Sequence, residues 1–559
     1  MIKINNSSVE CDVLVVGGGI GGLMAAISAA ESGAKVVIAE KSNTKRSGSG
    51  STGNDHFQCY IPEVHGEDMQ PIIREMNECL TGGYLDQDLL VLFLKESFDR
   101  VKDWDKWGIN MRPHGTWEFN GHAMPGRPRI FLKYAGANQK EVLTREALKR
   151  GVTIFNKLPI VEIITNDSGE VIGALGVSIA SEEPELRVFR AKNVILTTGT
   201  ANRLYSPKTA GMMFNLGFCP SCAGNGRAAA YRAGAKLVNL DIPNTHAGPK
   251  FFNRCGKATW IGVLKDYEGK PIGPFVAKPS KELGDITADI WHGVFGIKNK
   301  AGEPVYMDCS ETSEEDIQYM LWGLTQEGDT SLLNYMDDEG IDVRKHMVEF
   351  STYEPFLIGR GIEINEKAAT NIQGLYAAGD EVGNFRADIA SAATFGWIAG
   401  KSAAERAQDI RTFEPAEENS LVEEKRQFYS ELLSREAGTA SPSWKEVNIA
   451  LQQIMTDYAG VEVRSEHLFK AGLKYLKDLK GKATSAMYCQ NSHELMRCLE
   501  VLDLIQLGEL IMLTAQERKE TRGKHNRVDY PFTNPLNNNR FITVQKVEGK
   551  AEIKWRDRH

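Results

Sequence analysis

The sequence predicts an α/β fold in which a parallel-sheet domain is interrupted by an inserted α+β cap and followed by a helical domain. Three observations support this architecture. A strand, a glycine turn, a helix and a second strand follow one another between Cys11 and Lys41, and residues 193–205 and 374–407 each run from a buried strand into another glycine turn. From Glu414 on, the chain is rich in Leu, Glu, Lys and Gln at helical spacing.

Length and composition limit the class of protein. The chain has 559 residues, of which 42% are hydrophobic, so it should fold into two to four units with ordinary cores. Its 66 Lys and Arg against 74 Asp and Glu give a net charge of −8, which argues against nucleic acid or an anionic membrane as a partner.

The compartment is expected to be the cytoplasm. We find no apolar run long enough for a transmembrane segment, and the N-terminus "MIKINNSSVECDVLVVGGG" lacks the order of a secretion signal. Nine cysteines, mostly isolated, are typical of reduced thiols rather than of a disulfide framework.

The first element is a βαβ unit of the Rossmann-like kind. Strand Val13–Val16 runs into Gly17, Gly19 and Gly22, which have the G-x-G-x-x-G spacing that brings a pyrophosphate close to the backbone at a helix N-terminus. Glu40 ends the second strand, 23 positions after Gly17, where a carboxylate can accept hydrogen bonds from a ribose. The alternative is a glycine-rich turn that arose by chance.

The loop that follows is made of small residues. Residues 46–54 read "RSGSGSTGN", which leaves backbone N–H groups and hydroxyls free to line a phosphate and a ring. A flexible solvent linker is the alternative reading of such a Gly/Ser segment. NAD and FAD share the preceding fingerprint, so this unit by itself leaves the choice between them open.

Three later stretches carry a family resemblance. They are "NVILTTGTANRLY" (193–205), "CAGNGRAAAYRAGAKL" (222–237) and "GLYAAGDEVGNFRADIASAATFGWIAGKSAAERA" (374–407). Together they resemble the flavoprotein family that contains fumarate reductase, succinate dehydrogenase, L-aspartate oxidase and the alpha subunit of adenylylsulfate reductase. The resemblance runs from Cys11 to about Pro531 and implies a glutathione-reductase-type domain with extended FAD, with Asp380 near the ribityl chain and the segment after Ala390 near the isoalloxazine.

Motifs and resemblance together give a set of expected FAD-binding residues. They are Gly17, Gly19, Gly22, Glu40, Lys41, Ser47, Gly48, Ser51, Thr52, Gly53, Thr198, Gly199, Asn225, Asp380 and Ser391. Family members with covalent flavin carry a histidine within this small-residue loop. The matching positions here hold Ser and Gly, and His56 comes later, so we expect non-covalent FAD.

The expected catalytic residues are Arg254, His246 and Arg386. Arg386 stands where the fumarate reductase branch has its dicarboxylate-binding arginine, whereas the stretch from His246, "HAGPKFFNRCGKATWIGVLKDYEGKP", looks more like the adenylylsulfate reductase alpha subunit. Arg254 could hold an anion bidentately, and Trp260 belongs to a run of aromatics that would stack on a planar substrate. The alternative is a solvated face of the cap.

Motif order predicts the domain boundaries. An FAD-binding domain should comprise residues 1–243 and 350–408, a capping domain residues 244–349, a helical domain residues 409–530 and a C-terminal tail residues 531–559. The stretch "ETRGKHNRVDYP" resembles the family's terminal segment, which implies that Arg522 and His525 lie back toward the FAD domain.

Two questions of chemistry stay open. Cys219 and Cys222 form C-P-S-C, a spacing shared by redox dithiols, half zinc sites and plain structural cysteines; no second C-x-x-C completes a metal set, so we predict no metal site. The cysteine runs that ligate iron–sulfur clusters are also missing, so an iron–sulfur or other electron-carrier subunit is the expected partner, in a homo- or hetero-oligomer.

Three functions remain in competition. The first is catalysis on a small anionic substrate such as a nucleotide-linked sulfur oxyanion, similar to adenylylsulfate reductase. The second is oxidation or reduction of a dicarboxylate, as in fumarate reductase and succinate dehydrogenase. The third is a non-catalytic role as a flavin electron-relay subunit. In each case the chain is expected to be an FAD-dependent oxidoreductase or part of one.

Overall fold

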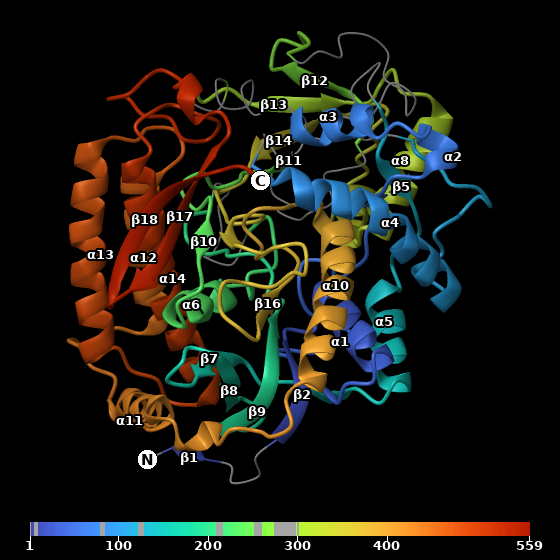
Figure 1. Ribbon diagram of the computed structural model, residues 1–559. Helices are drawn as coiled ribbons and strands as arrows, with labels where there is room; N and C mark the ends of the chain where they lie inside the picture. The colour runs from blue at the N-terminus through green and yellow to red at the C-terminus, as the bar shows by residue number, and fades with distance from the viewer. Residues whose placement is uncertain are drawn as a thin grey trace.

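A computed structural model gives the fold of the chain. It describes residues 2–4, 9–78, 84–120, 128–207, 216–250, 260–272, 298 and 301–559. The predicted mixture of a parallel-sheet domain, an inserted cap and a C-terminal helical domain is confirmed (Figure 1).

The largest sheet has eight strands with a parallel centre. Its order is β6 (Thr153–Phe155), β3 (Val36–Ala39), β2 (Val9–Val16), β9 (Glu185–Leu196), β8 (Val171–Ser178) and β7 (Ile160–Thr165). β1 (Lys3–Ile4) and β16 (Leu375–Ala377) pair in parallel with β9 as well. The pairs from β6 to β9 are parallel, whereas β8 runs antiparallel to both of its neighbours.

Two Ala-rich helices cover one face of this sheet. α1 (Ile20–Glu31) follows the first glycine turn, and α10 (Asp388–Gln408) packs along it and against β2 and β9. Glycines set their close approach: a Cβ at Gly396 would lie 2.3 Å from the carbonyl oxygen of Gly21, and one at Gly400 would lie 2.1 Å from that of Ala25. α6 (Asn225–Arg232) packs against β7 on the far side of the sheet from α1 and α10 (Figure 1).

The described part of the segment between β3 and β6 adds a short antiparallel strand pair, whose strands are far apart in sequence, and four helices. They are β4 (His56–Gln58), α2 (Pro62–His65), α3 (Gln70–Glu78), α4 (Gln87–Trp107), β5 (Phe131–Lys133) and α5 (Gln139–Lys149). α4 ends at Gly108, whose φ of 99° provides the left-handed cap.

The cap has a sheet and a core of its own. Its elements are β11 (Ala247–Pro249), β12 (Val263–Asp266), β13 (Val305–Asp308), α8 (Glu314–Gln326), α9 (Thr330–Asp338) and β14 (Val348–Thr352). The sheet order is β11-β14-β13-β12, with antiparallel pairing throughout. A separate hydrophobic cluster, which includes Trp260 and Phe350, lies beneath it. The fully buried Trp260 indole meets the Phe350 ring edge-on, so the expectation that Trp260 stacks on a substrate is wrong.

Four helices form the predicted helical domain on the side of the molecule opposite α1 (Figure 1). They are α11 (Ser420–Ser434), α12 (Trp444–Ala459), α13 (Glu466–Ala486) and α14 (Ser492–Glu517), preceded by a short 3₁₀ turn, Ala416–Glu418. Each helix begins after a Ser or Asn whose side chain accepts a hydrogen bond from a first-turn N–H, and Ser443 with Glu446 forms a full capping box at α12.

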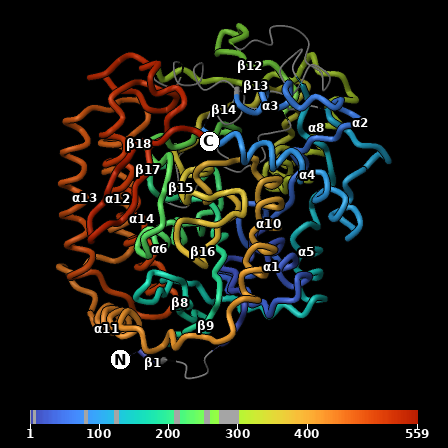
Figure 2. Tube along the Cα trace, in the orientation of Figure 1, coloured from blue at the N-terminus to red at the C-terminus, as the bar shows by residue number. Residues whose placement is uncertain are grey.

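The last segment is not the tail that the sequence predicts. After a 3₁₀ turn, Pro535–Asn537, the strands β17 (Arg540–Val547) and β18 (Lys550–Asp557) form a hairpin. β17 pairs with β10 (Leu237–Val238), which in turn pairs with β15 (Gly361–Ile362), so chain segments about 300 residues apart complete one sheet (Figure 2).

The segment that carries Arg522 and His525 lies against the β10 region. The buried His525 ring contacts Arg464 at 2.7 Å, and Arg464 donates to the carbonyl oxygen of Asp241 at 2.6 Å. Arg522 instead pairs with Glu520.

In the part of the chain that the structure describes, no helix combines the length and apolar character that crossing a membrane requires.

Candidate active site

A long cavity opens where β2, β3, β9 and β16 end, beside the N-termini of α1 and α6, and extends to the cap. Most of the residues expected to bind FAD line it. The lining members of that set are Gly17, Gly19, Glu40, Lys41, Ser47, Gly48, Thr52, Gly53, Thr198, Gly199, Asn225 and Asp380. Gly22, Ser51 and Ser391 lie just outside it.

The first glycine turn packs as tightly as its spacing predicts. Gly17 has a φ of 98°, and a Cβ on it would lie 2.5 Å from the carbonyl oxygen of Thr197, the residue that follows β9. A Cβ on Gly22 would lie 1.9 Å from the carbonyl oxygen of Gly17, so this glycine serves helix packing. Gly19 differs, because the nearest atom to its Cβ position is 4.0 Å away. Its bare backbone therefore faces the cavity at the start of α1.

Glu40 fixes the turn to the end of β3. Its Oε2 accepts the Gly18 N–H at 2.5 Å, and its Oε1 accepts the Ser42 N–H at 2.7 Å. Glu40 as a whole is 5% exposed, and it lines the cavity. Since two carboxylate oxygens offer about four acceptor positions, the group retains capacity for hydroxyl donors.

The glycines of the small-residue loop serve two different purposes, one at the cavity and one at the contact with the cap. A Cβ on Gly48 would meet only the Gly19 Cα, at 4.0 Å, so this glycine borders the cavity. Gly53, with a φ of 114°, is pressed against the cap, because a Cβ there would lie 2.1 Å from the carbonyl oxygen of Gln326. Thr52 donates to the carbonyl oxygen of Glu327 at 3.0 Å. The loop thus joins the cavity wall to the C-terminal end of α8.

Two carboxyl groups, Asp380 and Glu381, follow β16 at the third glycine turn, and Glu381 accepts from the second turn, which ends β9. Thr198 donates through its N–H and its hydroxyl to Glu381, at 2.6 and 2.7 Å. Burial raises the pKa of Glu381 to about 7. Desolvation, with the neighbouring Asp388 charge adding to it, raises the pKa of Asp380 to about 6. The buried Arg227 donates to the carbonyl oxygens of Gly199 and Asp380 and holds the two turns together.

His246 and Arg386 meet near the cap. The His246 Nε2 lies 3.4 Å from an Arg386 guanidinium nitrogen, and the Arg386 Nε donates to Asp388 at 2.9 Å. His246 is 2% exposed and lines the cavity, and its ring packs against both Phe218 and Phe356, with ring centroids at 5.0 and 5.2 Å. The structure therefore brings together two of the three residues expected to be catalytic. Arg254, the third, lies outside the described residues.

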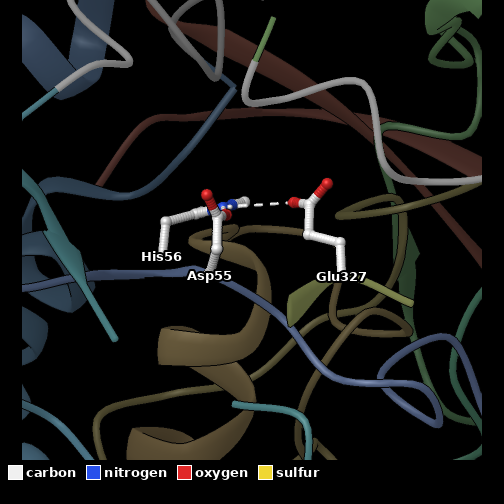
Figure 3. A group of neighbouring side chains, drawn as sticks. All are labelled: Asp55, His56 and Glu327. Carbon is white, nitrogen blue, oxygen red and sulfur yellow. Dashed lines mark hydrogen bonds and ion pairs between the residues drawn. The ribbon is translucent and has the colours of Figure 1, made fainter. Parts of the chain in front are cut away.

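Sequence reasoning missed one cluster at this end of the cavity. Asp55, His56 and Glu327 lie within reach of one another (Figure 3). The His56 Nδ1 is 2.6 Å from Asp55 and 3.5 Å from Glu327, and Lys133 donates to Asp55 at 3.0 Å. These groups could transfer protons or hold a cation. Asp55 and His56 are adjacent in sequence, but Glu327 comes from the cap, so no spacing pattern could have revealed the group.

Comparisons with known proteins agree with this layout. The "FAD binding domain" family model matches residues 12–387, and the "Fumarate reductase flavoprotein C-term" model matches residues 448–559. A fumarate reductase (CoM/CoB) polypeptide of Methanothermobacter marburgensis is 26% identical over 580 aligned residues, which cover 96% of this chain and 98% of that protein.

Two solved structures are similar over nearly the whole chain. The adenylylsulfate reductase of Archaeoglobus fulgidus superposes with a TM-score of 0.84 at 21% identity, covering 100% of this chain and 96% of that one. A quinol fumarate reductase chain of E. coli gives a TM-score of 0.81 at 19% identity, covering 98% and 97%. These likenesses establish a shared fold.

Proposed function

The chain belongs to the family of FAD-binding flavoproteins with a fumarate reductase-type C-terminal domain, and on that premise we propose that it transfers electrons between FAD and a small anionic substrate. The family makes it an FAD-dependent oxidoreductase. The observation that carries the substrate part of the proposal is the contact between Arg386 and His246 at the cap end of the cavity.

The residues of the cavity fit FAD. Gly19 and Gly48 leave space that a Cβ would fill, at the N-terminus of α1, where N–H groups favour a pyrophosphate. Glu40 would accept from the ribose, and Asn225 stands at the N-terminus of α6, where its side-chain oxygen accepts from Lys41 at 3.2 Å. Bound FAD supplies hydride or single-electron chemistry, and the protein supplies orientation and charge.

At the cap end, Arg386 would hold the substrate's anionic group. A guanidinium presents two parallel donors to a carboxylate or a sulfur oxyanion. Asp388, which accepts from the Arg386 Nε, and the His246 ring hold the guanidinium in place. His246 would give or take a proton at Nε2. Arg254 stays a further candidate for holding the anion.

We propose that the FAD is non-covalent. The loop 47–53 contains no histidine. The first histidine after it, His56, is engaged through Nδ1 with Asp55. An attachment through this ring would have to break that hydrogen bond with a buried carboxylate.

Electrons would reach or leave the flavin through a separate protein. The seven cysteines of the described residues are free, and the five outside the C-P-S-C turn are buried in the cores of the FAD and helical regions or of the cap. They form no cluster of four among those residues that could ligate iron and sulfur. An iron–sulfur or other electron-carrier subunit is therefore the partner that we propose.

A substrate panel tests the proposal and separates its versions. The purified protein is first reduced under anaerobic conditions and mixed with fumarate or with adenylylsulfate. The oxidised protein is then mixed with succinate or with sulfite plus AMP. Flavin absorbance is followed in both experiments. We expect saturable flavin turnover with either the dicarboxylate pair or the sulfur-oxyanion pair. An electron-relay subunit would show none with any of them.

The Arg386→Lys variant supplies the matched test of the anion site. It keeps the charge but loses the bidentate geometry, so turnover should fall by roughly a hundredfold while FAD content is unchanged. Arg344→Lys, in an exposed ion pair of the cap, is the control. Normal turnover in the Arg386→Lys variant would mean that the anion is held elsewhere.

A further inference from the structure

A four-residue turn in the cavity wall carries two cysteines. Cys219 and Cys222 both line the cavity, in the loop that leads into α6. The Cys222 N–H donates to the carbonyl oxygen of Cys219 at 3.0 Å, which closes a turn. The end residues of such a turn have Cα atoms less than about 7 Å apart, close to the range of about 4.4–6.8 Å that disulfides span. The backbone thus brings the two sulfurs within bonding reach.

The turn is held by other groups. Asn202 donates its side-chain amide to the carbonyl oxygen of Cys219 at 2.7 Å and its N–H to that of Cys222 at 2.9 Å. The Lys41 ammonium donates to the carbonyl oxygen of Ser221. Because backbone and lysine contacts fix the loop, its shape does not depend on the thiols, and they can change their bonding without unfolding it.

The two thiols differ in character. The Cys222 thiol donates to the Cys219 sulfur, and this contact, with the Ser221 N–H and the Lys41 ammonium, lowers the pKa of Cys219 to about 6 in spite of its partial burial. In contrast, burial raises the pKa of Cys309, in the cap core, to about 12. A thiolate is the nucleophilic form of cysteine, so Cys219 has the surroundings of an attacking residue and Cys222 those of a resolving one.

A zinc site is the weaker reading of the same pair. A structural zinc ion needs four ligands, and C-P-S-C offers two. The group of potential metal ligands found among the described residues, Asp55, His56 and Glu327, contains neither cysteine. Two cysteines are also too few to ligate an iron–sulfur cluster, which needs four ligands.

We propose that Cys219 and Cys222 form a redox-active pair that reduces a small organic disulfide at the wall of the cavity by thiol–disulfide exchange. The Cys219 thiolate attacks one sulfur of the disulfide, forms a mixed disulfide and releases the first thiolate. The Cys222 sulfur, after losing its proton to solvent, then attacks Cys219 and releases the second. The small disulfide gains two electrons, and the cysteine pair loses two. This activity goes beyond the flavin chemistry proposed above and does not depend on it.

The test uses the whole protein with its cofactor, reduced and desalted, and bis(2-hydroxyethyl) disulfide as the probe. We expect two equivalents of 2-mercaptoethanol per chain and a peptide in which Cys219 and Cys222 are joined. The Cys222→Ser variant should stop at one equivalent, with a hydroxyethylthio group on Cys219. In Cys219→Ser the reaction at pH 7 should be at least about tenfold slower, because the remaining Cys222 thiol is buried, and burial by itself raises the pKa of a thiol and limits access to it.

Two controls keep the test decisive. Cys309→Ser removes a buried thiol outside the pair and should react like the unchanged protein. Bound flavin, read from its absorbance, reports that each variant is folded. The initial rate should rise with pH through about 6 and then level off. The proposal is overturned if Cys219→Ser reacts as fast as the unchanged protein, or if no internal disulfide forms.

Discussion

Glu40 is the residue that joins the glycine turn to the expected ribose site. Its carboxylate accepts the Gly18 and Ser42 N–H groups and lines the cavity. Glu40→Ala should therefore weaken FAD binding by about 1–3 kcal/mol, measured by flavin titration of the apoprotein, since ribose hydroxyls lose a charged acceptor. Glu31→Ala, in an exposed ion pair on α1, is the control. Unchanged affinity would place the ribose elsewhere.

Glu381 makes stability depend on pH in a defined direction. Its pKa is about 7 in the folded chain against an ordinary 4.5. Between these values the folded chain binds more protons than the unfolded one, so this group makes the free energy of unfolding fall as pH rises. Glu381→Gln should remove up to about 3 kcal/mol of that fall between pH 4.5 and 7. Denaturant titrations at several pH values measure it, and equal slopes in both proteins would refute the assignment.

At the residue scale, the sequence predicts what local spacing determines. The positions of Gly17, Gly19 and Gly22 are predictable because the steric requirements of a βαβ turn involve only six consecutive residues. The interpretation of Gly53 as a cofactor contact is incomplete, because its missing Cβ makes room for the cap at Gln326. Contacts of this kind, like that between His56 and Glu327, depend on packing between segments distant in sequence and leave no local signal.

α14 is the element that ties the helical domain to the cavity. Its Glu500 accepts from Lys41 at 2.7 Å, and Arg203 and Arg497 bind the same carboxylate. These cations hold the pKa of Glu500 well below its usual value against the effect of burial. Helical periodicity predicts that this helix forms, but it does not predict that Glu500 on the helix binds and positions Lys41 in the cavity wall.

Removal of this carboxylate should be costly. Glu500→Ala removes the carboxylate that the buried Arg203 shares with the partly buried Lys41 and Arg497, and it should lower the free energy of unfolding by about 3–5 kcal/mol. Glu509→Ala, which breaks an exposed pair on the same helix, should cost less than about 1 kcal/mol. Thermal melts of both variants provide the comparison. Equal melting temperatures would show that the Glu500 network contributes nothing.

The terminal hairpin shows where element prediction stops. β17 and β18 carry charged residues at several positions, such as Lys546, Glu552 and Lys554, and β17 also pairs with the short β10, near residue 237. The turn between β17 and β18, at Glu548 and Gly549, has a positive φ at both residues and is a local hairpin signal that motif order overlooks. The pairing of β17 with β10 has no such signal, because the two strands lie about 300 residues apart. The helices before the hairpin are predicted because their periodicity and caps are local.

At the scale of the whole molecule, the fold follows from the order of three glycine turns and a helical segment. The first two turns end neighbouring parallel strands, β2 and β9, and the third follows β16 on the other side of β9, so their loops converge on one edge of the sheet. The cap then closes the far end, where His246 and Arg386 meet. The sequence predicts that the three turns converge. It does not predict the contact between the cap and the small-residue loop at residues 46–54, because that contact depends on packing between distant segments.

The central claim is that this cavity holds FAD without a covalent bond. The direct measurement is acid precipitation of the purified yellow protein, followed by chromatography of the supernatant. The account predicts one intact FAD per chain in the supernatant and a colourless pellet, because no histidine stands in the loop 47–53 and His56 is engaged with Asp55. Flavin that stays with the precipitated protein, or a protein purified without any flavin-binding capacity, would contradict it.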